Sequence, residues 1–430
     1  MPEAEKTGLY RGYGWVTRLV LPLAYRRVSR KLAQSGVPDA RIRERLGHAT
    51  QSKPDGYLVW FHAASVGESL SVLSLIERLG ILRPDLAFLI TSGTATSAQL
   101  IEQRMPPRCR HQFAPLDAAA PLDRFLRHWQ PKAAIIVESE LWPQTLVRTY
   151  ETGARLALVN ARLSRKSLDG WSRRPKTAKA LLDLFSVIMT QNSKMADALI
   201  TLGADPDRVK PGANLKATSA PLPVDTKLVA EMRADLGPRT VWVAASTHLG
   251  EEETVLAAHQ ELLETDSDLC LILAPRHPER GSEIEAMIIA MGLSVACRSK
   301  GGLPGTAQVY LADTLGELGS WYALAPFVFL GGSLLPIGGH NPYEVAQVGV
   351  PVLSGSHVTN FAETFADLGK FGGWQTVSAA TDLSQHAKLW LDDAAALKRA
   401  CDGARAFMSA QQQGLENIAQ TLLDALLPKD

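Results

Sequence analysis

Short apolar runs alternate with helix-like stretches along the whole chain. In the first half the runs are YLVWFHAAS, LAFLITSG, AAIIVESE, RLALVNAR and SVIMTQNS, and in the second half they are TVWVAAST, LCLILAPR, VYLAD, FVFLGGS and VPVLSG. Helix-like segments such as SLSVLSLIERLG and SKMADALITLG follow these runs. Apolar runs of this length between helices are typical of parallel sheets that are buried on both faces. The pattern therefore predicts an α/β protein with two doubly wound domains.

A break in this pattern separates the two halves. The stretch KPGANLKATSAPLPVDTKLV, residues 210–229, contains several prolines and a glycine that interrupt any periodicity. We expect an N-terminal domain over residues 36–217 and a C-terminal domain over residues 218–430, with the last helix able to pack back on the N-terminal domain. Open parallel sheets bind ligands beyond the carboxyl ends of their strands, so the expected site is a cleft between the domains.

Residues 1–35 differ in composition from the rest of the chain. The stretch LYRGYGWVTRLVLPLAYRRVSRKL interleaves aromatic and aliphatic residues with cations, and no acid interrupts it. Such a segment can place apolar groups at a membrane surface while its cations meet anionic lipid, at about 1 kcal/mol per basic residue. The alternative is an amphipathic helix packed on its own domain, and Pro22 is expected to interrupt either helix. Because no apolar run reaches the roughly 18 residues of a spanning helix, and we expect no cleaved secretory leader, we predict peripheral association.

Composition narrows the choice of partners. The 45 Lys and Arg residues nearly balance the 44 Asp and Glu residues, for a formal net charge of +1. Proteins that bind duplex nucleic acid typically carry a basic field that this chain lacks, so nucleic acid is not an expected partner. The four cysteines are scattered and the histidines show no metal-ligand spacing. We therefore predict buried thiols in a reducing compartment, no structural metal and no cofactor.

A glycine-rich loop follows the apolar run that ends at Leu330. After it comes a helix start, with Asn341 as the expected N-cap, Pro342 as the first helical residue and Glu344 three residues after the cap. A cap alone would explain these three residues. It does not explain the glycines of the loop, which are Gly331, Gly332, Gly338 and Gly339. Glycines allow positive φ and a close approach of backbone N–H groups to a phosphate, so we interpret the loop as a nucleotide-phosphate site that is not a Walker loop.

Two acidic clusters follow apolar runs in the first half. Ser65 and Glu68 have the spacing of a capping box, and Gly67 beside them leaves room for a ligand. A helix dipole would lower the pKa of Glu68 and make it a weaker base, unless a cleft desolvates the carboxylate. Glu138 and Glu140 lie two residues apart at the end of another run, where paired carboxylates are costly unless they are solvated or used. A structural and a functional interpretation are equally open for both clusters.

Polar residues also follow two apolar runs in the second half. Arg276, His277 and Arg280 could form a fork that holds phosphate or carboxylate, or equally a helix-entry turn with surface arginines. The segment VAASTHLGEEE offers Ser246 and its polar neighbours at another strand end. Most of the acids that follow, residues 251–253, are expected to act as partners of the helix dipole and nothing more.

Eight blocks of residues together resemble a known enzyme family. They are HAASVGE (62–68), ESELWPQ (138–144), NARLSRKS (160–167), GANLK (212–216), STHLGEEE (246–253), PRHPER (275–280), ADTLGELG (312–319) and GGSLLPIGGHNPYE (331–344). In this order, and across both expected domains, they are similar to the Kdo transferases. These glycosyltransferases of lipopolysaccharide biosynthesis transfer 3-deoxy-D-manno-octulosonic acid (Kdo) from CMP-Kdo to a lipid A precursor, lipid IVA.

The resemblance implies a GT-B fold, in which two Rossmann-like domains face each other across a cleft and bind the acceptor and the CMP-sugar respectively. It implies an inverting transfer without a metal, at the cytoplasmic face of the inner membrane, with Glu68 as the general base and Glu140 as a second catalytic acid. On the acceptor side it points to Ser65, Gly67, Glu138 and Arg162. On the donor side it points to Lys216, Ser246, Arg276, His277, Thr314, Gly316, Glu317, Gly338, Gly339, His340, Asn341 and Glu344.

The chain departs from the family pattern at two positions, and two other functions stay open. Gln144 stands where Asn is expected, and Ala64 stands where Val or Ile is expected. One alternative is a glycosyltransferase or epimerase of the same architecture that uses a UDP-sugar. The other is a catalytically idle nucleotide-binding or membrane scaffold, which the presence of Glu68 and Glu140 argues against. Architecture alone does not decide, because one fold hosts many functions.

Overall fold

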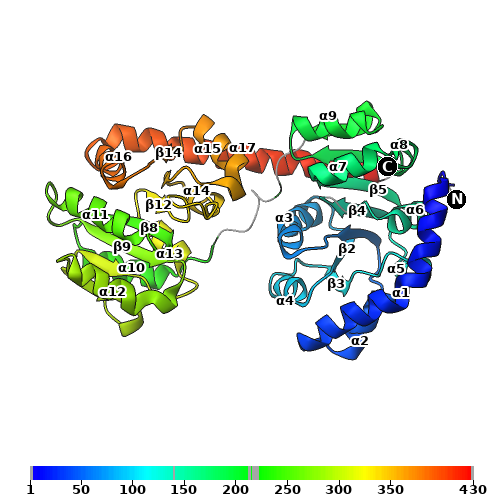
Figure 1. Cartoon of the computed structure of the whole chain (residues 1–430), viewed down its shortest axis with the longest axis horizontal. Helices are drawn as coiled ribbons and strands as arrows, with labels where there is room; N and C mark the ends of the chain where they lie inside the picture. The colour runs from blue at the N-terminus through cyan, green and yellow to red at the C-terminus, as the bar shows by residue number, and fades with distance from the viewer. Residues whose placement is uncertain (1–2, 139–140, 212–214, 216–221, 428–430) are drawn as a thin grey trace. The chain divides into compact units, whose positions relative to one another are not determined.

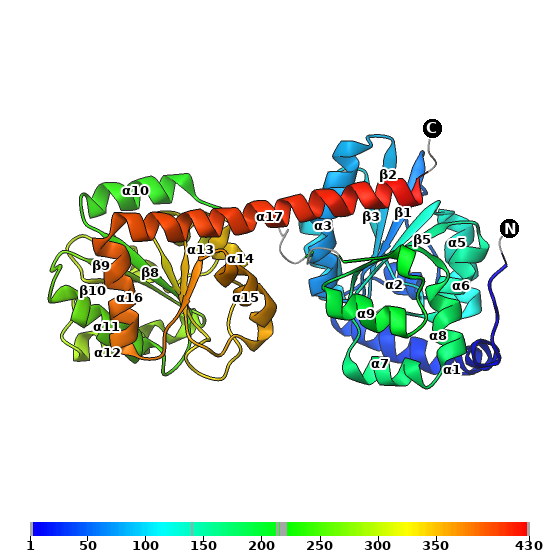
Figure 2. The same ribbon diagram turned by 90° about the horizontal axis from the view of Figure 1, so that it is seen from above.

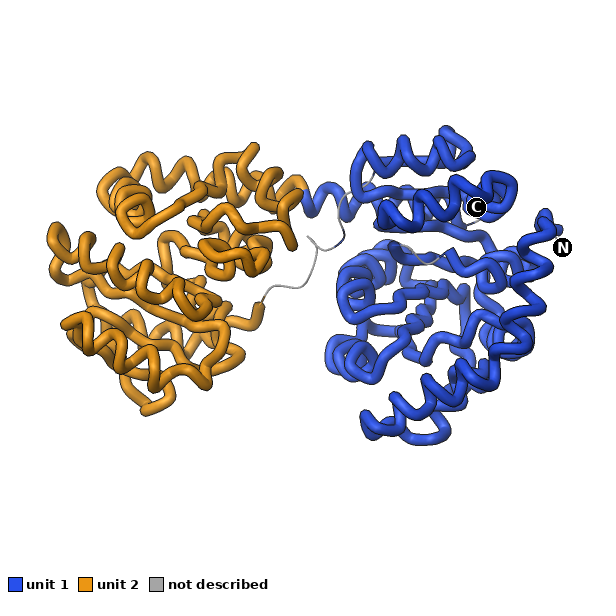
Figure 3. The backbone as a smooth tube through the Cα atoms, in the orientation of Figure 1, with its two compact units in different colours: residues 1–219, 411–430 blue, residues 220–410 orange. Residues whose placement is uncertain are grey.

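The computed structural model describes residues 3–138, 141–211, 215 and 222–427 (Figure 1). The chain divides into two compact units (Figure 3). The first unit comprises Met1–Ser219 together with Gln411–Asp430, and the second comprises Ala220–Ala410. Each unit is built around its own parallel sheet, and each is described by itself.

A seven-stranded sheet with the spatial order β3-β2-β1-β4-β5-β6-β7 forms the centre of the first unit. The strands are β1 (Tyr57–His62), β2 (Leu86–Ser92), β3 (Cys109–Phe113), β4 (Ala133–Val137), β5 (Arg155–Ala161), β6 (Phe185–Thr190) and β7 (Val209–Pro211). All pairs of neighbouring strands are parallel, and His62 of β1 lies opposite Ile136 of β4. The strand order reverses between β1 and β4, so the carboxyl ends of these two strands form the topological switch point, where open α/β sheets bind ligands.

Helices connect these strands and precede the sheet. They are α1 (Gly8–Gln34), α2 (Asp39–Ile42), the 3₁₀ helix η1 (Arg43–Leu46), α3 (Val66–Leu82), α4 (Ala95–Gln103), α5 (Ala119–Trp129), α6 (Pro143–Glu151), α7 (Arg165–Ser172), α8 (Pro175–Leu182) and α9 (Ser193–Thr201).

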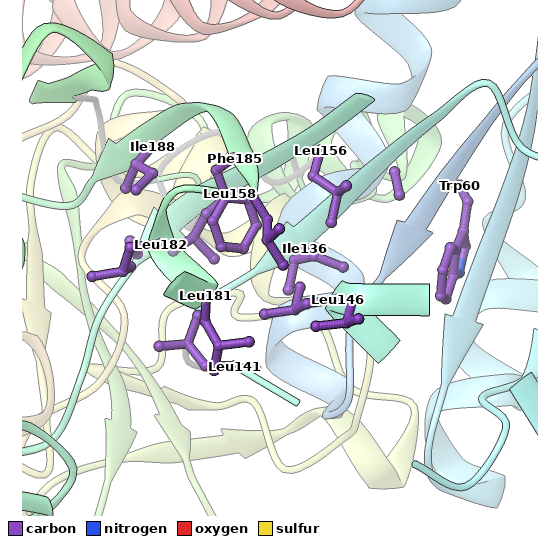
Figure 4. Packing of buried hydrophobic residues seen from close by; sticks show 14 of the residues in the cluster. Trp60, Ile136, Leu141, Leu146, Leu156, Leu158, Leu181, Leu182, Phe185 and Ile188 are labelled. Carbon is purple, nitrogen blue, oxygen red and sulfur yellow. The ribbon is translucent and has the colours of Figure 1, made fainter. Parts of the chain in front are cut away.

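Alternate residues of the strands enter two separate cores, one on each face of the sheet. Figure 4 shows Trp60, Ile136, Leu156 and Leu158 in the core that also receives side chains of α5, α6 and α8. Their strand neighbours, such as Phe61, enter the opposite core beneath α3. Because both faces of the sheet are covered, the strand sequences are continuous apolar runs and do not alternate between apolar and polar residues.

The chain returns to the first unit through its last helix, α17 (Ala394–Leu426) (Figure 2). Residues of its final turns, including Ile418 and Leu422, are buried in the core beneath α3. The hydroxyl of Tyr57, at the start of β1, donates a hydrogen bond of 2.9 Å to the carbonyl of Leu426. The last turns of α17 are therefore part of the first unit.

A second seven-stranded sheet, ordered β10-β11-β9-β8-β12-β13-β14, forms the centre of the second unit. Its strands are β8 (Val241–Thr247), β9 (Cys270–Pro275), β10 (Val295–Cys297), β11 (Val309–Leu311), β12 (Val328–Leu330), β13 (Val352–Ser354) and β14 (Trp374–Thr376). Its helices are α10 (Thr226–Leu236), α11 (Glu252–Leu263), α12 (Gly281–Ala290), α13 (Leu318–Leu324), α14 (Tyr343–Ala346), α15 (Ala362–Lys370), α16 (Ala380–Asp392) and the first part of α17. The chain passes from β8 to β9 on one side and reaches β12 on the other, so β8 and β12 flank the switch point of this sheet.

All ten apolar runs of the sequence form strands, and four further strands were not predicted. Strand β3 has the polar sequence CRHQF, while β7, β10 and β14 are only three residues long. A window of three residues holds no measurable periodicity, and the polar side chains of β3 hide its apolar face. The fold class is nevertheless the predicted one, a two-domain α/β architecture.

Helix α1 runs without interruption through Pro22, so the expectation of a break there is wrong. A proline in a helix removes one backbone hydrogen bond, but the contacts of α1 outside that turn hold it in place. Tyr13 donates a hydrogen bond of 2.9 Å to Asp117, and a Cβ atom at Gly14 would lie only 3.0 Å from the side chain of Gln144 in α6. Over the part of the chain that the structure describes, no helix has the length and apolar content needed to cross a bilayer.

Candidate active site

Glu68 lies at the switch point of the first sheet, in the first turn of α3. Ser65 is the N-cap of this helix and its hydroxyl oxygen accepts the N–H of Glu68 at 3.2 Å. The Glu68 carboxylate accepts two hydrogen bonds of 2.8 Å, one from the N–H of Ala64 and one from the hydroxyl of Ser65. The spacing that suggested a capping box thus orients the carboxylate of Glu68 beside the end of β1.

The environment of Glu68 favours the protonated form of its carboxyl group. The side chain is only 8% exposed. Burial raises the pKa of Glu68, the neighbouring Glu138 adds to this effect, and the hydrogen bonds from Ser65 and Ala64 oppose it. Burial is the largest of these causes, and desolvation is the condition under which Glu68 was expected to be an effective base.

Two strand ends near Glu68 have unusual backbone conformations. Glu138, after β4, and Asn160, in β5, have φ values of +57° and +54°. The amide of Asn160 donates a hydrogen bond of 3.3 Å to the carboxylate of Glu138. Non-glycine residues in this region cost about 1–3 kcal/mol each and tend to cluster at functional sites. Glu138 thus lies at the carboxyl edge of the sheet, held by Asn160 and near enough to Glu68 to affect its pKa.

The other residues predicted for the acceptor side are less constrained. Gly67 is exposed and a Cβ atom there would meet no atom within 4 Å, so nothing in this unit requires glycine at this position. Arg162 follows β5 and is exposed. Glu140 lies outside the described residues, and its role as a second catalytic acid stays a prediction.

Three histidines meet at the switch point of the second sheet. The rings of His248, after β8, and His340, after β12, are stacked with centroids 5.1 Å apart, and their Nε2 atoms lie 2.9 Å apart. His277, after β9, contacts the edge of His248 at a centroid distance of 5.6 Å. His248 thus contacts both His277 and His340, which were predicted to bind the donor. His248 itself lies in the segment VAASTHLGEEE but was not among the predicted donor residues.

The stacked histidines at this switch point hold little positive charge at neutral pH. Burial is the main cause that lowers the pKa of His340 to about 4, and the nearby His248 and Arg276 add to it. Burial is also the main cause that lowers the pKa of His248, with Glu251 opposing it. Each neutral ring has one N–H donor and one acceptor nitrogen, so the pair can share one hydrogen bond and offer others. No group of described residues has the composition and geometry to hold a metal ion.

Glu251 holds the glycine-rich loop to the end of β8. This buried carboxylate accepts hydrogen bonds from the N–H groups of His248 (3.0 Å), Gly332 (2.6 Å), Ser333 (2.9 Å) and Leu334 (2.9 Å). The expectation that most acids of residues 251–253 serve only the helix dipole is therefore wrong for Glu251. It is also wrong for Glu252, which pairs with Arg280 at 2.9 Å.

The hydrogen bonds to Glu251 bear on the glycine-rich loop, which the sequence suggested was a nucleotide-phosphate site. Gly332, Gly338 and Gly339 have the expected positive φ values of +66°, +110° and +77°. However, the N–H groups of residues 332–334 bind Glu251, and the N–H of Gly339 donates to the carbonyl of Gly332 at 2.7 Å. These N–H groups are satisfied inside the protein and are not open to a phosphate. A Cβ atom at Gly332 would lie 2.9 Å from the ring of His340, so this glycine lets the two histidines stack.

The predicted helix start after the loop is displaced by one residue. Helix α14 begins at Tyr343 with Pro342 at the N-cap position, not with Asn341. Asn341 still satisfies the end of the helix, because its side-chain oxygen accepts the N–H of Tyr343 at 3.2 Å. Its amide also lies 3.3 Å from the carboxylate of Glu344. Pro342 already has helical φ and ψ values of −75° and −14°, so the prediction and the structure differ by one residue at the helix end.

The remaining predicted donor residues fall into two groups. Arg276 is exposed after β9, and Ser246, at the end of β8, has a φ of +56°. Arg280 pairs with Glu252 and Glu283, so of the two interpretations left open by the sequence, the helix-entry turn describes Arg280 better than the fork.

A second group follows β11. Thr314 and Glu317 bond to each other, and Glu317 pairs with Arg298 at 2.7 Å. Gly316 has a φ of +89°, which suits the turn between them. The internal pairing gives these residues a structural role of their own. Lys216 lies outside the described residues, and its place near the nucleotide stays a prediction.

Comparison with known proteins identifies the family. A family model described as 3-deoxy-D-manno-octulosonic-acid transferase (kdotransferase) matches residues 40–219. The chain is 35% identical over 367 residues to a probable mitochondrial 3-deoxy-D-manno-octulosonic acid transferase of Arabidopsis thaliana, covering 82% of this chain and 81% of that one. The chain belongs to the Kdo transferase family. The 3-deoxy-D-manno-octulosonic acid transferase of Haemophilus influenzae is 31% identical over 366 residues, covering 82% and 84% of the two chains.

Solved structures agree on the fold of this Kdo transferase. A glycosyltransferase from Rickettsia africae superposes with a TM-score of 0.57 at 10% identity, covering 87% of this chain and all of that one. A UDP-GlcNAc 2-epimerase from Neisseria meningitidis gives the same TM-score at 12% identity, covering 86% of this chain and all of that one. At such low identity the likeness concerns the fold alone, which is the two-domain α/β GT-B fold. Family membership, in contrast, favours Kdo transfer over the use of a UDP-sugar.

Proposed function

We propose that this Kdo transferase moves Kdo from CMP-Kdo to a lipid A precursor such as lipid IVA, with inversion at the anomeric carbon and with Glu68 as the general base. The observation that carries this proposal is the environment of Glu68. Its carboxylate lies at a sheet switch point, is oriented by Ala64 and Ser65, and has a raised pKa. A base with a pKa closer to neutrality removes a hydroxyl proton more effectively than an ordinary carboxylate.

The proposed reaction is a single displacement. The acceptor hydroxyl oxygen forms a bond to the anomeric carbon of Kdo while the bond from that carbon to the phosphate oxygen of CMP breaks. Glu68 takes the hydroxyl proton, and CMP leaves with the bonding electron pair. One displacement inverts the configuration at the anomeric carbon. The transition state resembles an oxocarbenium ion, so groups that stabilise the departing phosphate also lower the barrier.

The second unit is the proposed source of that stabilisation. Arg276 places an exposed guanidinium after β9, and within the described ranges of the chain its side chain has no ion-pair partner. The neutral ring of His340 can donate a hydrogen bond without bringing a charge of its own. Together they provide a cation and a polar donor for the phosphate of CMP-Kdo. Lys216 and Glu140 are proposed to contribute as the family resemblance implies.

Helix α1 supports attachment to a membrane surface, which we propose is the cytoplasmic face of the inner membrane. Trp15, Leu19 and Leu23 are 68%, 74% and 70% exposed, and their spacing of four residues places them along one face. Tyr10 and Leu32 are buried in the same helix. Helix α1 thus packs on its own unit through buried side chains and also exposes a stripe of apolar side chains to solvent. Replacing Leu19 and Leu23 by serine should release the protein from anionic vesicles in a flotation assay, and retention would contradict this attachment.

The decisive experiment is a transfer assay read by mass spectrometry. Purified protein is incubated with CMP-Kdo generated in place and a tetraacylated lipid A precursor, beside a Glu68→Ala control. The wild type should add Kdo units to the precursor, and the variant should lose about 10²–10⁴-fold in rate while its affinity for CMP stays nearly unchanged. Absence of product, with CMP still bound, would redirect the proposal to another sugar or acceptor. Competition by UDP in place of CMP would support the UDP-sugar alternative.

A further inference from the structure

An apolar cavity of about 400 Å³ lies at the carboxyl edge of the first sheet. Its wall includes Val20, Leu21 and Ala24 of α1 and the loops that follow β1, β2, β3 and β4. We call it the α1 cavity. Its volume falls within the range of small-molecule sites, roughly 300–1,000 Å³. A cavity with such a wall favours a ligand with a hydrocarbon portion.

One cation, Arg45 of η1, lies in this apolar wall. Its Nη1 donates a hydrogen bond to the carbonyl of Ala114. Its Nε is buried without a hydrogen-bond partner, and no carboxylate of the described residues forms an ion pair with the guanidinium. The carboxylate in the same wall, Asp117, instead accepts hydrogen bonds from Tyr13 and Thr145. Burial lowers the pKa of Arg45 to about 10, so the side chain is still charged at neutral pH. A desolvated cation is costly unless an anion accompanies it, so the cavity favours a ligand that also carries a negative group.

The α1 cavity joins two features already described. Val16 and Val20 line the cavity and are also 57% and 47% exposed, so its wall continues into the outer surface of α1. Ala64 lines the cavity as well, and its N–H donates to the carboxylate of Glu68. A ligand in the cavity therefore has access from the apolar surface of α1 and contacts Ala64, whose N–H binds the carboxylate of the proposed base.

We propose that the α1 cavity binds an acyl chain of the acceptor lipid and that Arg45 pairs with a phosphate group of the same molecule. This inference rests on the proposed function and gives it a specificity site for a phosphorylated, acylated acceptor. The hydrocarbon chain fills the space beneath α1, the phosphate neutralises Arg45, and the sugar hydroxyl reaches Glu68. The site selects acylated over deacylated acceptors and phosphorylated over neutral ones.

A binding experiment tests the charge without requiring catalysis. The full-length protein is titrated calorimetrically with dodecyl phosphate and with uncharged dodecyl maltoside, both below their critical micelle concentrations. Arg45→Met should weaken binding of dodecyl phosphate at least about tenfold, because a hydrogen-bonded charge pair is lost, and should leave dodecyl maltoside unchanged. Arg45→Lys should retain part of the affinity. Arg43→Met, which removes an exposed cation from the same 3₁₀ helix, is the matched control and should bind like the wild type. Equal affinity of Arg45→Met and the wild type for dodecyl phosphate overturns the proposal.

A kinetic experiment tests the hydrocarbon portion. Ala24→Phe places a ring in the cavity, while Ala33→Phe adds the same ring at an exposed position of α1. Ala24→Phe should lower kcat/KM for the tetraacylated acceptor about tenfold, and should leave kcat/KM for the deacylated, phosphorylated sugar and KM for CMP-Kdo unchanged. Ala33→Phe should behave like the wild type. Equal losses with both acceptors overturn the assignment of the cavity to an acyl chain.

The two experiments separate this inference from the proposed function. If no Kdo is transferred but dodecyl phosphate binds in a manner that depends on Arg45, the proposed reaction fails and the ligand class of the cavity stands. If Kdo is transferred and neither substitution matters, the cavity assignment fails alone. If phosphatidylglycerol vesicles displace dodecyl phosphate and the tetraacylated precursor does not, the occupant is bulk phospholipid and the assignment to the acceptor is overturned.

Discussion

Each unit buries a glutamate at the switch point of its sheet, and the two glutamates differ in their partners. Glu251 accepts four N–H groups from the backbones of two loops. Glu68 accepts one N–H and one hydroxyl from the described residues and has Glu138 as a neighbouring acid. A carboxylate surrounded by backbone donors holds loops in place. A desolvated carboxylate with fewer donors keeps the capacity to bind a proton.

The largest effect should follow the substitution Glu68→Gln. We expect kcat to fall about 10²–10⁴-fold, because a glutamine cannot remove a proton. The free energy of unfolding should stay within about 1 kcal/mol of the wild type, because the amide oxygen can accept the Ala64 N–H while the Ser65 hydroxyl reverses to accept from the amide nitrogen. Transfer kinetics and thermal unfolding measured on one preparation check both halves. A stable variant with normal kcat would remove Glu68 from the mechanism.

The same substitution at Glu251 should act on stability first. Whichever way the amide of Glu251→Gln turns, its nitrogen faces two N–H donors, either those of His248 and Gly332 or those of Ser333 and Leu334. Buried donors without partners cost about 1–3 kcal/mol each, so the second unit should lose about 3 kcal/mol of stability. Differential scanning calorimetry should show an earlier transition, by roughly 2–4 °C per kcal/mol for a unit of this size.

Residual activity sharpens the contrast between the two glutamates. Below its melting temperature the Glu251→Gln variant should show a raised KM for CMP-Kdo, because Glu251 positions the glycine-rich loop, and a kcat much closer to the wild type than that of Glu68→Gln. If Glu251→Gln lost kcat as severely as Glu68→Gln, with an unchanged melting temperature, the proposed difference between a loop-holding and a proton-binding carboxylate would be refuted.

A smaller effect is expected from an alanine in the glycine-rich loop. Gly339 and Gly372 have φ values of +77° and +79°, but only Gly339 has close neighbours, since a Cβ atom there would lie 3.1 Å from the backbone of Val358. Both alanine substitutions should cost about 1–2 kcal/mol of stability from the left-handed backbone alone. Only Gly339→Ala should also raise the KM for CMP-Kdo, by a few-fold. An equal KM in both variants would remove this turn from the donor site.

The smallest expected effect is the pH dependence that arises from Glu68. Because the pKa of Glu68 is raised in the folded protein, kcat/KM should increase with pH through a pKa above the ordinary value of a glutamate. The folded state binds this proton more tightly than the unfolded chain does. The contribution of Glu68 to stability is therefore fully present below the unfolded pKa and is lost as pH rises through the folded pKa. The Glu68→Gln variant should lack this part of the stability profile.

Much of the architecture could be predicted from the apolar pattern, and the reason lies in burial. Runs such as 133–137 are continuous because α5 and α6 cover one face of the sheet while α3 covers the other. Strand β3 escaped prediction because His111 and Gln112 are polar, although both are buried: His111 lies 2.9 Å from the hydroxyl of Ser92, and Gln112 accepts a hydrogen bond from Trp129. Such partners are distant in sequence and cannot be read from the strand itself.

The candidate site, like the fold, could be predicted only in part from the sequence. The sequence identified Glu68, Glu138, His277 and His340 as chemically active types at strand ends. It did not reveal the role of Glu251, because that role depends on N–H groups 81–83 residues further along the chain. It also did not reveal Arg45, whose significance comes from the absence of a counter-ion among the described residues around a cavity that several separate segments form.

By itself the sequence determined the two parallel sheets, the family and the residue types at the ends of the strands, because these depend on local periodicity and on short motifs. Only the tertiary structure distinguished the surroundings of two similar buried glutamates, since both follow a strand and lie at the start of a helix. Glu251 holds a loop through four N–H groups, whereas the pKa of Glu68 is raised. The tertiary structure also decided that Glu68 is buried, which is the largest cause of its raised pKa. The physical reason is that desolvation and hydrogen bonding are set by neighbours in space, whereas sequence spacing specifies only neighbours along one element.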